Sequence, residues 1–320
     1  MRAFLFPGQG SQRVGMAADL FRTDAGFRDL VKFASAQVGE DLERVCQRGP
    51  DKLLQRTPLL QPLLVAVSLG YLRHLTAHGL RPDVMLGHSL GEITALAASG
   101  VLTFEEAVIV AAKRGALMEQ SAAKVRGGML AVSTTQRDRA LALIAGMAGS
   151  LSVTLANDNA PNQFVLSGDL DALTEAARLL TAERLGRCQP LPVSGPWHSP
   201  FMTTARDEFR IWAKSLSFKR PQAPLILNAT GRAETDPERI RHHVAETIAG
   251  PVQWRTAMES LAAMRPRQIL EIGPGRVLAG LARANGMEGA TEIFCVSDLR
   301  GVELVVAGPR ATAQTDGGGK

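Results

Sequence analysis

The sequence predicts an α/β fold in which helices cover both faces of a mostly parallel sheet and a small ferredoxin-like domain is inserted in the chain. Three observations predict it. Short apolar segments alternate with helical segments through most of the 320 residues, as in parallel sheets. The section 127–193 follows a separate βαββαβ order, which is the ferredoxin-like arrangement. A Gly-x-Ser-x-Gly pentapeptide at 87–91 lies between a strand segment and a helical segment.

The elements of the larger part of the chain follow from apolar runs and helical periodicity. Arg2–Phe6 is an apolar run that ends at Pro7-Gly8, so it is expected to be a short buried strand. The elements expected after it in the first half are a helical pattern from about Gly15, a helix over 51–79, a strand over 83–87, and helices over 90–99 and 104–121. Those expected in the last third are strands over 225–228, 268–272 and 292–296, helices over 238–248 and 254–264, and a helix opened by the turn 273–275.

The middle of the chain has a different rhythm of shorter elements. Strands are expected over 129–133, 152–156, 164–167 and 188–193, helices over 136–145 and 170–185, and a turn over 157–162. We therefore expect a small ferredoxin-like domain over 127–193, within the usual size range of domains. The flanking segments, 1–126 and 194–310, would form the α/β core. The Gly/Thr-rich tail, 311–320, is expected to be disordered.

Composition and charge restrict the class of protein. Hydrophobic residues make up 45% and charged residues 21%, which excludes bulk disorder. The net charge of +5 is mild and no basic run alternates with aromatic residues, so we expect no nucleic-acid partner. The three cysteines are far apart and no Cys/His spacing fits zinc, so we expect reduced thiols and no bound metal. No apolar stretch approaches the ~20 residues of a membrane helix and no signal peptide is present, so a soluble cytoplasmic protein is expected.

The pentapeptide Gly87-His88-Ser89-Leu90-Gly91 is the strongest local signal of chemistry. Its place between a strand and a helix is what a nucleophile elbow requires, because the sharp turn needs small residues on both sides of the serine. Ser89 would then lie at a helix N-terminus, where the dipole and free N–H groups favour negative charge. The Leu90 amide would supply one half of an oxyanion hole. The alternative is a loop in which Ser89 merely caps the helix.

A serine nucleophile needs a base, and the chain has six histidines. His88 is inside the tight turn, and its side chain would face the wrong way to act as the base for Ser89. Four others are expected on solvated helix surfaces: His74, His78, His242 and His243. His198 is different, because it lies in a loop just after the last strand of the small domain, and loops at domain junctions often carry functional groups. From the residues alone, His198 fits a structural role as well as a catalytic one.

Six short motifs follow one another in order along the chain. They are 6–12 (FPGQGSQ), 87–92 (GHSLGE), 114–118 (RGALM), 156–161 (ANDNAP), 193–198 (VSGPWH) and 271–275 (EIGPG). Together they resemble the motifs of the malonyl-CoA:acyl-carrier-protein transacylase family, and the resemblance covers roughly residues 3–300. Each motif is modest alone, but six in register are highly specific. The resemblance implies an α/β-hydrolase-like core with an inserted ferredoxin-like subdomain, which agrees with the elements above.

The resemblance assigns roles to individual residues. Ser89 would be the nucleophile and His198 the base, as a Ser–His dyad in which His198 takes the serine proton during attack and returns it to the leaving thiolate. In the family a backbone carbonyl orients the histidine, and here it would be that of Thr247. The backbone N–H groups of Gln9 and Leu90 would form the oxyanion hole. Without the family, Gln9 would be interpreted as a turn residue between two glycines.

Three further residues are assigned to the acyl group. Arg114 resembles the family's malonate-binding arginine, whose planar guanidinium forms two parallel N–H···O bonds to a carboxylate that a lysine would not reproduce. The alternative for Arg114 is an ordinary exposed helix arginine. Gln61 would support the same site, although a surface position at a helix N-terminus fits it nearly as well. Trp197 precedes the base, where relatives often carry Phe or Ser. Its ring would crowd the α-carbon of the acyl group and favour malonyl over methylmalonyl, or it would reshape the pocket for a different acyl unit.

The function that the resemblance implies is acyl transfer by a ping-pong mechanism. Malonyl-CoA would acylate Ser89, and the phosphopantetheine thiol of an acyl carrier protein would then accept the malonyl group for fatty-acid or polyketide synthesis. No cofactor is expected, and malonyl-CoA is the substrate. With no fused synthase domains, the chain is expected to act in trans and as a monomer. The mildly basic charge would suit a carrier protein, which is usually acidic.

Two other functions would use the same residues. The dyad could transfer the acyl group to water, as in acyl-carrier-protein thioesterases with a proofreading role, although Arg114 argues for a dicarboxylic acyl donor. The chain could also be a catalytically silent scaffold that binds a carrier protein. The intact set of Ser89, His198 and Arg114 argues against the scaffold.

Overall fold

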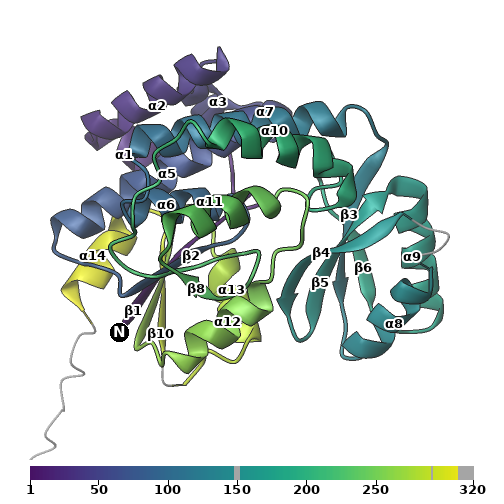
Figure 1. Cartoon of the computed structure of the whole chain (residues 1–320). Coiled ribbons are helices and arrows are strands. Elements are labelled where there is room, and N and C mark those ends of the chain that lie inside the picture. Colours follow the sequence, from purple (N-terminus) through teal and green to yellow (C-terminus); the bar gives the residue numbers. More distant parts are fainter. Residues whose placement is uncertain (148–151, 290, 309–320) are drawn as a thin grey trace, which may run out of the picture.

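The computed structural model describes residues 1–147, 152–289 and 291–308, and the expected disordered tail, 311–320, lies outside them (Figure 1). The described residues form a six-stranded sheet, here called sheet A, and a four-stranded antiparallel sheet, here called sheet B. Helices cover both faces of sheet A, and two helices cover the outer face of sheet B. The predicted α/β class, with a mostly parallel sheet and an inserted ferredoxin-like unit, is confirmed.

Sheet A is parallel except at one edge. Its strands are β1 (Arg2–Phe6), β2 (Val84–Gly87), β7 (Leu225–Ile226), β8 (Ala233–Glu234), β9 (Gln268–Ile272) and β10 (Glu292–Val296). Their spatial order is β10-β9-β1-β2-β7-β8, and of these described strands the edge strand β8 alone runs antiparallel to its neighbour. Since β1 and β2 are parallel neighbours, the loops that follow Phe6 and Gly87 meet at the same edge of the sheet.

The core helices flank sheet A. Before β2 they are α1 (Ala18–Thr23), α2 (Ala25–Val38), α3 (Leu42–Arg48), α4 (Asp51–Leu54) and α5 (Thr57–Ala77). After β2 come α6 (Gly91–Ala98), α7 (Phe104–Ala122), the 3-10 turn η1 (Pro200–Met202), α10 (Thr203–Ala213), α11 (Pro237–Glu246), α12 (Trp254–Ala263), α13 (Val277–Ala284) and α14 (Leu299–Ala307). A capping box begins α7, because the Thr103 side chain accepts from the Glu106 amide and the Glu106 carboxylate accepts from the Thr103 amide.

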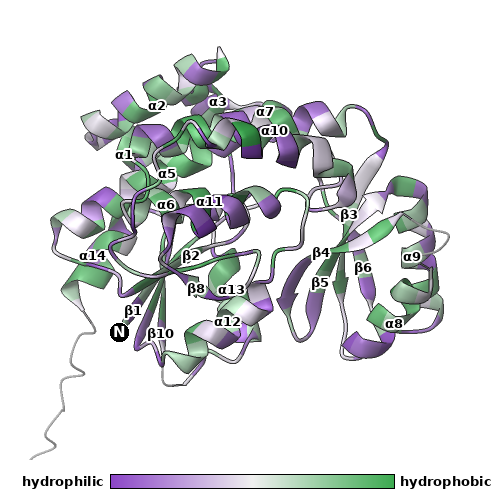
Figure 2. Ribbon diagram, viewed as in Figure 1, coloured by the Kyte–Doolittle hydropathy of each residue, from purple (hydrophilic) through white to green (hydrophobic). Residues whose placement is uncertain are grey.

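Alternate residues of the central strands face opposite layers of helices. Phe4 and Phe6 lie in a large hydrophobic cluster with α5, α6 and α7, whereas Ala3 and Leu5 lie in a second cluster with α12 and α13. Burial on both faces explains why β1 is apolar at nearly every position. Figure 2 shows hydrophobic residues gathered on the central strands and on the helices beside them.

Sheet B comes from the middle of the chain. Its elements are β3 (Gly127–Ser133), α8 (Arg137–Met147), β4 (Val153–Ala160), β5 (Gln163–Asp169), α9 (Leu170–Ala182) and β6 (Arg187–Pro190). The order β4-β5-β3-β6 with antiparallel neighbours is that of a ferredoxin-like sheet. Leu130 and Val132 lie in a cluster with α8 and α9, whereas Met129 and Ala131 face the other way and line a cavity between the two sheets.

The prediction of a turn over 157–162 is wrong for its first four residues. β4 continues through Ala160, and two register shifts against β5 mark irregularities in the ladder. The polar run stays extended because the core pairs with it: the Asp158 amide donates to the Val252 carbonyl, and the Val252 amide donates to the Ala156 carbonyl. Local turn propensity is overridden by this long-range pairing.

Other bounds also differ from the expectation. The helix expected over 51–79 is two helices, α4 and α5, because Thr57-Pro58 starts a new helix and proline is favoured in a first turn. The helical pattern expected from about Gly15 starts at Ala18, and the strand expected over 188–193 ends at Pro190. Two helices, α10 and α14, are absent from the prediction; each buries only three residues.

We infer that the small domain is the section 127–193, because sheet B and its two helices lie within it. The segments 1–126 and 194–310 would then form the core. Besides the pairing of β4 with Val252, the buried carboxylate of Asp158 forms an ion pair with Arg255 of α12. The small unit is thus attached to the core by more than its two connecting segments. None of the helices described has the length and hydropathy needed to span a membrane.

Substitution of Gly91 tests the close contact between α6 and β1. A Cβ at Gly91 would lie 1.9 Å from the carbonyl oxygen of Phe6, which belongs to the central strand and has no room to retreat. We expect Gly91→Ala to lower the free energy of unfolding by about 3 kcal/mol or more, or to prevent folding. Gly280 in α13 is the control, because a Cβ there meets no atom within 4 Å, and Gly280→Ala should raise stability by up to ~1 kcal/mol. Urea denaturation measures both variants, and equal effects would contradict the contact.

Candidate active site

The turn between β2 and α6 holds Ser89 in a strained backbone conformation. Its φ is 51°, in the left-handed region that residues other than glycine rarely adopt. The turn is also crowded: a Cβ at Gly87 would lie 2.0 Å from the Gly91 carbonyl, and a Cβ at Gly8 would lie 2.4 Å from the His88 carbonyl. Glycine is therefore required at these positions by the close approach of neighbouring backbone.

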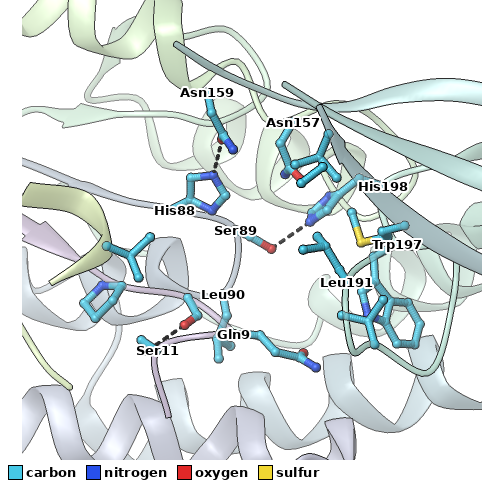
Figure 3. Close-up of a pocket in the computed structure, with 18 of the residues that line it drawn as sticks. Gln9, Ser11, His88, Ser89, Leu90, Asn157, Asn159, Leu191, Trp197 and His198 are labelled. Atoms are coloured by element: carbon cyan, nitrogen blue, oxygen red, sulfur yellow. Dashed lines mark hydrogen bonds between the residues drawn. The ribbon is translucent and has the colours of Figure 1, made fainter. Parts of the chain in front are cut away.

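Ser89 and His198 are hydrogen-bonded. Ser89 Oγ lies 2.7 Å from His198 Nε2 (Figure 3), and His198 Nδ1 lies 2.7 Å from the Thr247 carbonyl oxygen. Since a carbonyl can only accept, Nδ1 carries the proton and donates it, which leaves Nε2 as the acceptor for the Ser89 hydroxyl. The fold thus brings together two side chains that are 109 positions apart in the sequence.

The surroundings of His198 keep its imidazole neutral. Burial, together with the positive charge of Arg114, lowers the pKa of His198 to about 3, although the hydrogen bond to Thr247 acts in the opposite direction. At neutral pH the ring is therefore in the form that accepts a proton. His88 does not share this role, because its Nε2 lies 2.8 Å from Asn159 Oδ1 and points away from the serine (Figure 3).

Arg114 extends from α7 to the same hydroxyl. Its Nη2 donates to Ser89 Oγ at 3.2 Å and its Nη1 donates to Gln61 Oε1 at 2.9 Å. Arg114 is 3% exposed and Gln61 is 1% exposed, so neither occupies the surface position that the sequence left open. Burial lowers the pKa of Arg114 to about 10, against the attraction of Glu92, and the guanidinium stays charged at neutral pH. Because both bonds go to neutral oxygens, its charge is available to an anion.

Two backbone amides border the cavity beside the serine. Leu90 follows the serine at the start of α6, and Gln9 belongs to the loop after β1 (Figure 3). Within the described ranges no acceptor takes either amide, whereas the Gly91 amide donates to the His88 carbonyl. The loop lies against the turn, since a Cβ on Gly8 would be 3.6 Å from the Leu90 nitrogen. Two N–H groups without an acceptor, on residues that line one cavity, are the kind of donors that a developing oxyanion needs.

Two buried polar residues near the serine, Glu92 and Asn228, have no role in the sequence-based prediction, although Glu92 ends the motif at 87–92. The Asn228 side chain accepts from the Ser89 amide at 2.8 Å and donates to the Gly87 carbonyl at 2.7 Å. Glu92 Oε1 accepts from the amide of Asn228 at 2.7 Å and from its side chain at 2.9 Å. Burial raises the pKa of Glu92 to about 7, opposed by these bonds and by Arg114. An acidic residue in an apolar helix and an asparagine just past a parallel strand are the signals that could have identified the pair.

These groups surround one cavity of about 240 Å³ between sheet A and sheet B. Its apolar lining comes from sheet B, from the segment after β6, and from α7 and α13, as Met118, Met129, Ala131, Val165, Leu191, Val193, Trp197, Val277, Leu278 and Leu281. Trp197 is 4% exposed, and its ring lies beside Leu191 on the wall (Figure 3). The described lining contains no aspartate or glutamate, so Arg114 gives the cavity a positive character.

The structure brings the sequence-selected residues together. Ser89, His198, Gln9, Leu90, Arg114, Gln61 and Trp197 all line the cavity. Thr247 does not line it and contacts it through His198. In the part of the chain that the structure describes, no three His, Cys, Asp or Glu side chains form a metal-binding group. The arrangement therefore offers a nucleophile, a base and a fixed cation around a single space.

Comparisons with known proteins identify relatives over nearly the whole chain. A family model described as the acyl transferase domain matches residues 3–298. The malonyl CoA-acyl carrier protein transacylase of Escherichia coli O157:H7 is 35% identical over 282 residues, which cover 88% of this chain and 91% of that protein. The match to the family model includes every residue of the cavity lining.

Solved structures give the same family. An acyl carrier protein S-malonyltransferase from Vibrio cholerae has a TM-score of 0.88 at 36% identity and covers 95% of this chain and 99% of that chain. A structure of a type II polyketide-synthase acyl-carrier protein in complex with its malonyl-transacylase contains a chain with a TM-score of 0.90 at 32% identity, covering 96% and 99%. The chain therefore belongs to the malonyl-CoA:acyl-carrier-protein transacylase family and is an acyltransferase.

Proposed function

We propose that this acyltransferase moves a malonyl group from malonyl-CoA to the phosphopantetheine thiol of an acyl carrier protein, by a ping-pong reaction through an acyl-Ser89 intermediate. One observation carries the proposal. Ser89 Oγ is within hydrogen-bond distance of a neutral imidazole, at 2.7 Å, and of a buried guanidinium, at 3.2 Å. A nucleophile, its base and an anchor for a free carboxylate share one cavity. The names of the relatives support the same donor and acceptor, in fatty-acid or polyketide synthesis.

In the first half-reaction the Ser89 hydroxyl attacks the thioester carbonyl of malonyl-CoA. His198 Nε2 takes the hydroxyl proton as the new C–O bond forms, and the carbonyl electron pair moves to oxygen. When the tetrahedral intermediate collapses, the C–S bond breaks and His198 returns the proton to the CoA thiolate. The Thr247 carbonyl accepts from Nδ1–H throughout, so it stabilises the transient imidazolium.

The oxyanion of each intermediate is bound by the backbone amides of Leu90 and Gln9. Neither amide has an acceptor within the described ranges, so no existing bond must be broken when the charge forms. Leu90 is also at the N-terminus of α6, where the helix dipole favours a negative charge. Preorganised donors of this kind act without reorganisation at the moment of reaction.

In the second half-reaction CoA has left the cavity, and the carrier thiol takes its place. His198 removes the thiol proton, the sulfur attacks the ester carbonyl, and the C–O bond to Ser89 breaks as the proton passes to the serine oxygen. These steps balance without a cofactor. All of the groups come from one chain, so the proposed steps need no residue from a second copy.

Acyl selectivity comes from the guanidinium and from the wall opposite it. Arg114 would exchange its bond to the serine hydroxyl for the carboxylate of the malonyl group, while Gln61 keeps its plane fixed. The buried ring of Trp197 narrows the cavity beside the base, so a methyl branch on the acyl α-carbon would meet it. We therefore propose malonyl as the preferred acyl unit over methylmalonyl.

Intact-protein mass spectrometry with a panel of acyl-CoAs tests the intermediate. We expect one malonyl adduct on the wild type, a lower yield with methylmalonyl-CoA because of Trp197, and no adduct on Ser89→Ala. Holo acyl carrier protein should then remove the adduct and carry it. Release of free malonate in place of transfer would identify a hydrolase, and a full adduct on Ser89→Ala would show that another residue is the nucleophile.

Arg114→Ala should reduce malonyl transfer selectively. The variant lacks the fork that binds the free carboxylate, which should remove about 2–4 kcal/mol of transition-state binding. Acetyl transfer has no such carboxylate to lose and should fall much less or rise. The values of kcat/KM for both donors are compared, with Arg178→Ala as the control because Arg178 is an exposed arginine paired with Glu175 on α9. Equal losses for malonyl and acetyl donors would mean that Arg114 is not the anchor.

The pH profile of kcat/KM for malonyl-CoA should lack the fall in activity at mildly acidic pH that protonation of an ordinary histidine base would cause. His198 has a pKa of about 3, so it is neutral and able to accept a proton until the pH falls toward that value. We expect kcat/KM for malonyl-CoA to show no limb near pH ~6.5, the unperturbed histidine value. Glu92→Gln is the control, since Glu92 has a pKa of about 7 and titrates in this window. A limb that persists near pH ~6.5 in Glu92→Gln would contradict a neutral buried base.

A further inference from the structure

The side chain of Asn228 spans the turn that holds Ser89. It comes from the loop after β7, and because β7 pairs in parallel with β2, the residue arrives beside the end of β2. Its Oδ1 accepts from the Ser89 amide at 2.8 Å, and its Nδ2 donates to the Gly87 carbonyl at 2.7 Å. One planar carboxamide thereby connects the last residue of β2 with the strained serine two positions later.

This bridge matters because the serine conformation is unfavourable on its own. A residue with a Cβ keeps a left-handed φ only where surrounding contacts over-determine it. Gly87 and Gly91 permit the turn but do not fix it, since glycine is the least restrained residue. Asn228 restrains the carbonyl on one side of the turn and the amide on the other.

Glu92 supports the orientation of the Asn228 carboxamide that the Ser89 amide and the Gly87 carbonyl also require. Glu92 Oε1 accepts from the backbone amide of Asn228 at 2.7 Å, so it is an acceptor at this position, and it also accepts from Nδ2 at 2.9 Å. The nitrogen of the carboxamide must therefore face Glu92, and the oxygen must face the Ser89 amide. Asn228 is 2% exposed and Glu92 is 3% exposed, so bulk water does not compete for these bonds.

The bridge also leaves one amide for the reaction. At the start of α6 the Ser89 amide is taken by Asn228, and the Gly91 amide is taken by the His88 carbonyl. The Leu90 amide lies between them and has no acceptor in the described part of the chain. The Leu90 N–H shares its peptide plane with the Ser89 carbonyl, which accepts from the Glu92 amide at 3.1 Å. The left-handed φ of Ser89, which Asn228 supports, sets how this plane is turned relative to the Ser89 amide.

Asn228 is tied as well to the segment that orients the base. The backbone carbonyl of Asn228 accepts from the Gln253 amide at 2.8 Å. Gln253 lies shortly after Thr247, whose carbonyl accepts from His198 Nδ1 at 2.7 Å. The supports of the nucleophile and of the base are therefore connected through one short stretch of chain, 247–253.

We propose that Asn228, oriented by Glu92, is a positioning residue for acyl transfer: it holds the Ser89 turn in its reactive conformation and aims the Leu90 amide at the oxyanion. It acts through these neighbours and touches no substrate. The proposal rests on the proposed function, because it concerns Ser89 as a nucleophile. It requires that loss of Asn228 slows the chemistry while Arg114 continues to bind the donor.

Asn228→Ala removes both bonds across the turn. We expect kcat for malonyl transfer to holo acyl carrier protein to fall roughly 10- to 100-fold, with KM for malonyl-CoA within about threefold of the wild type. Labelling of Ser89 by a fluorophosphonate, followed by intact-protein mass spectrometry, should slow by a similar factor. That reaction needs the same serine but neither CoA nor a carboxylate on Arg114.

Ser99→Ala is the matched control. Ser99 is buried at the other end of α6 and its hydroxyl donates to the Leu96 carbonyl, so this variant also loses a buried hydrogen bond, but not at the turn. Its kcat and labelling rate should stay within about twofold of the wild type. A kcat for Asn228→Ala as high as that of Ser99→Ala, or a raised KM at unchanged kcat, would overturn the proposal. The wild-type rate in the same assay tests the acyltransferase function separately.

Asn228→Asp has nearly the same shape and serves if the alanine variant does not fold. Its second oxygen would face two acceptors, Glu92 Oε1 and the Gly87 carbonyl. Two carboxyl groups in contact share a proton at low pH, which restores a donor, and they lose it as the pH rises. We therefore expect kcat relative to the wild type to fall as the pH is raised from about 6 to about 9.

The other ionisable groups around this pair do not produce the same trend. Arg114 faces Glu92 from α7 and stays charged over this range, and burial lowers the pKa values of His88 and His198, so both stay neutral. A kcat for Asn228→Asp that parallels the wild type at every pH would overturn the proposal. A relative loss that grows with pH, at unchanged KM, supports it.

Discussion

One constraint underlies the architecture: a serine must be held at a φ of 51° at the point where a central strand gives way to a helix. The conformation is possible because Gly8, Gly87 and Gly91 leave room for backbone to approach backbone at distances that no side chain would allow. His198 also has a positive φ, of 60°. Both members of the hydrogen-bonded pair are therefore strained, and such strain persists only where the fold enforces it. The parallel sheet enforces it by bringing the ends of β1, β2 and β7 to one edge.

The electrostatics of the cavity follow from the same burial. His198 and Arg114 contact one hydroxyl, and removal from water disfavours the charged form of both. Their intrinsic pKa values differ by several units, so the imidazole becomes neutral while the guanidinium keeps its proton. One environment thereby produces a base and a cation side by side. Glu92, which is buried as well, offsets part of the cost of that cation without contacting it.

Short motifs determined much of what could be predicted. The glycines around Ser89 report a local backbone requirement, and the alternation of apolar and helical segments reports the layers, so both are visible in sequence. The prediction of a turn over 157–162 was wrong because the residue that pairs with β4 and keeps it extended, Val252, is remote in sequence. Asn228 escaped prediction for the same reason: a single polar residue after a two-residue strand has no periodic signal, and its contacts with Ser89 and Glu92 exist only in three dimensions.

The pairing of β4 with Val252 bears on how the cavity distinguishes acyl groups. Two backbone bonds join β4 to the core beside the cavity, and the ion pair between Asp158 and Arg255 lies next to them. Rotation of the small unit away from the core on that side would have to break these contacts and the bonds of Asn159 to His88 and Asn285. These contacts hold the wall that sheet B contributes to the cavity against the core. Under the proposed function, discrimination among acyl groups would then reside in the fixed shape and charge of the cavity lining.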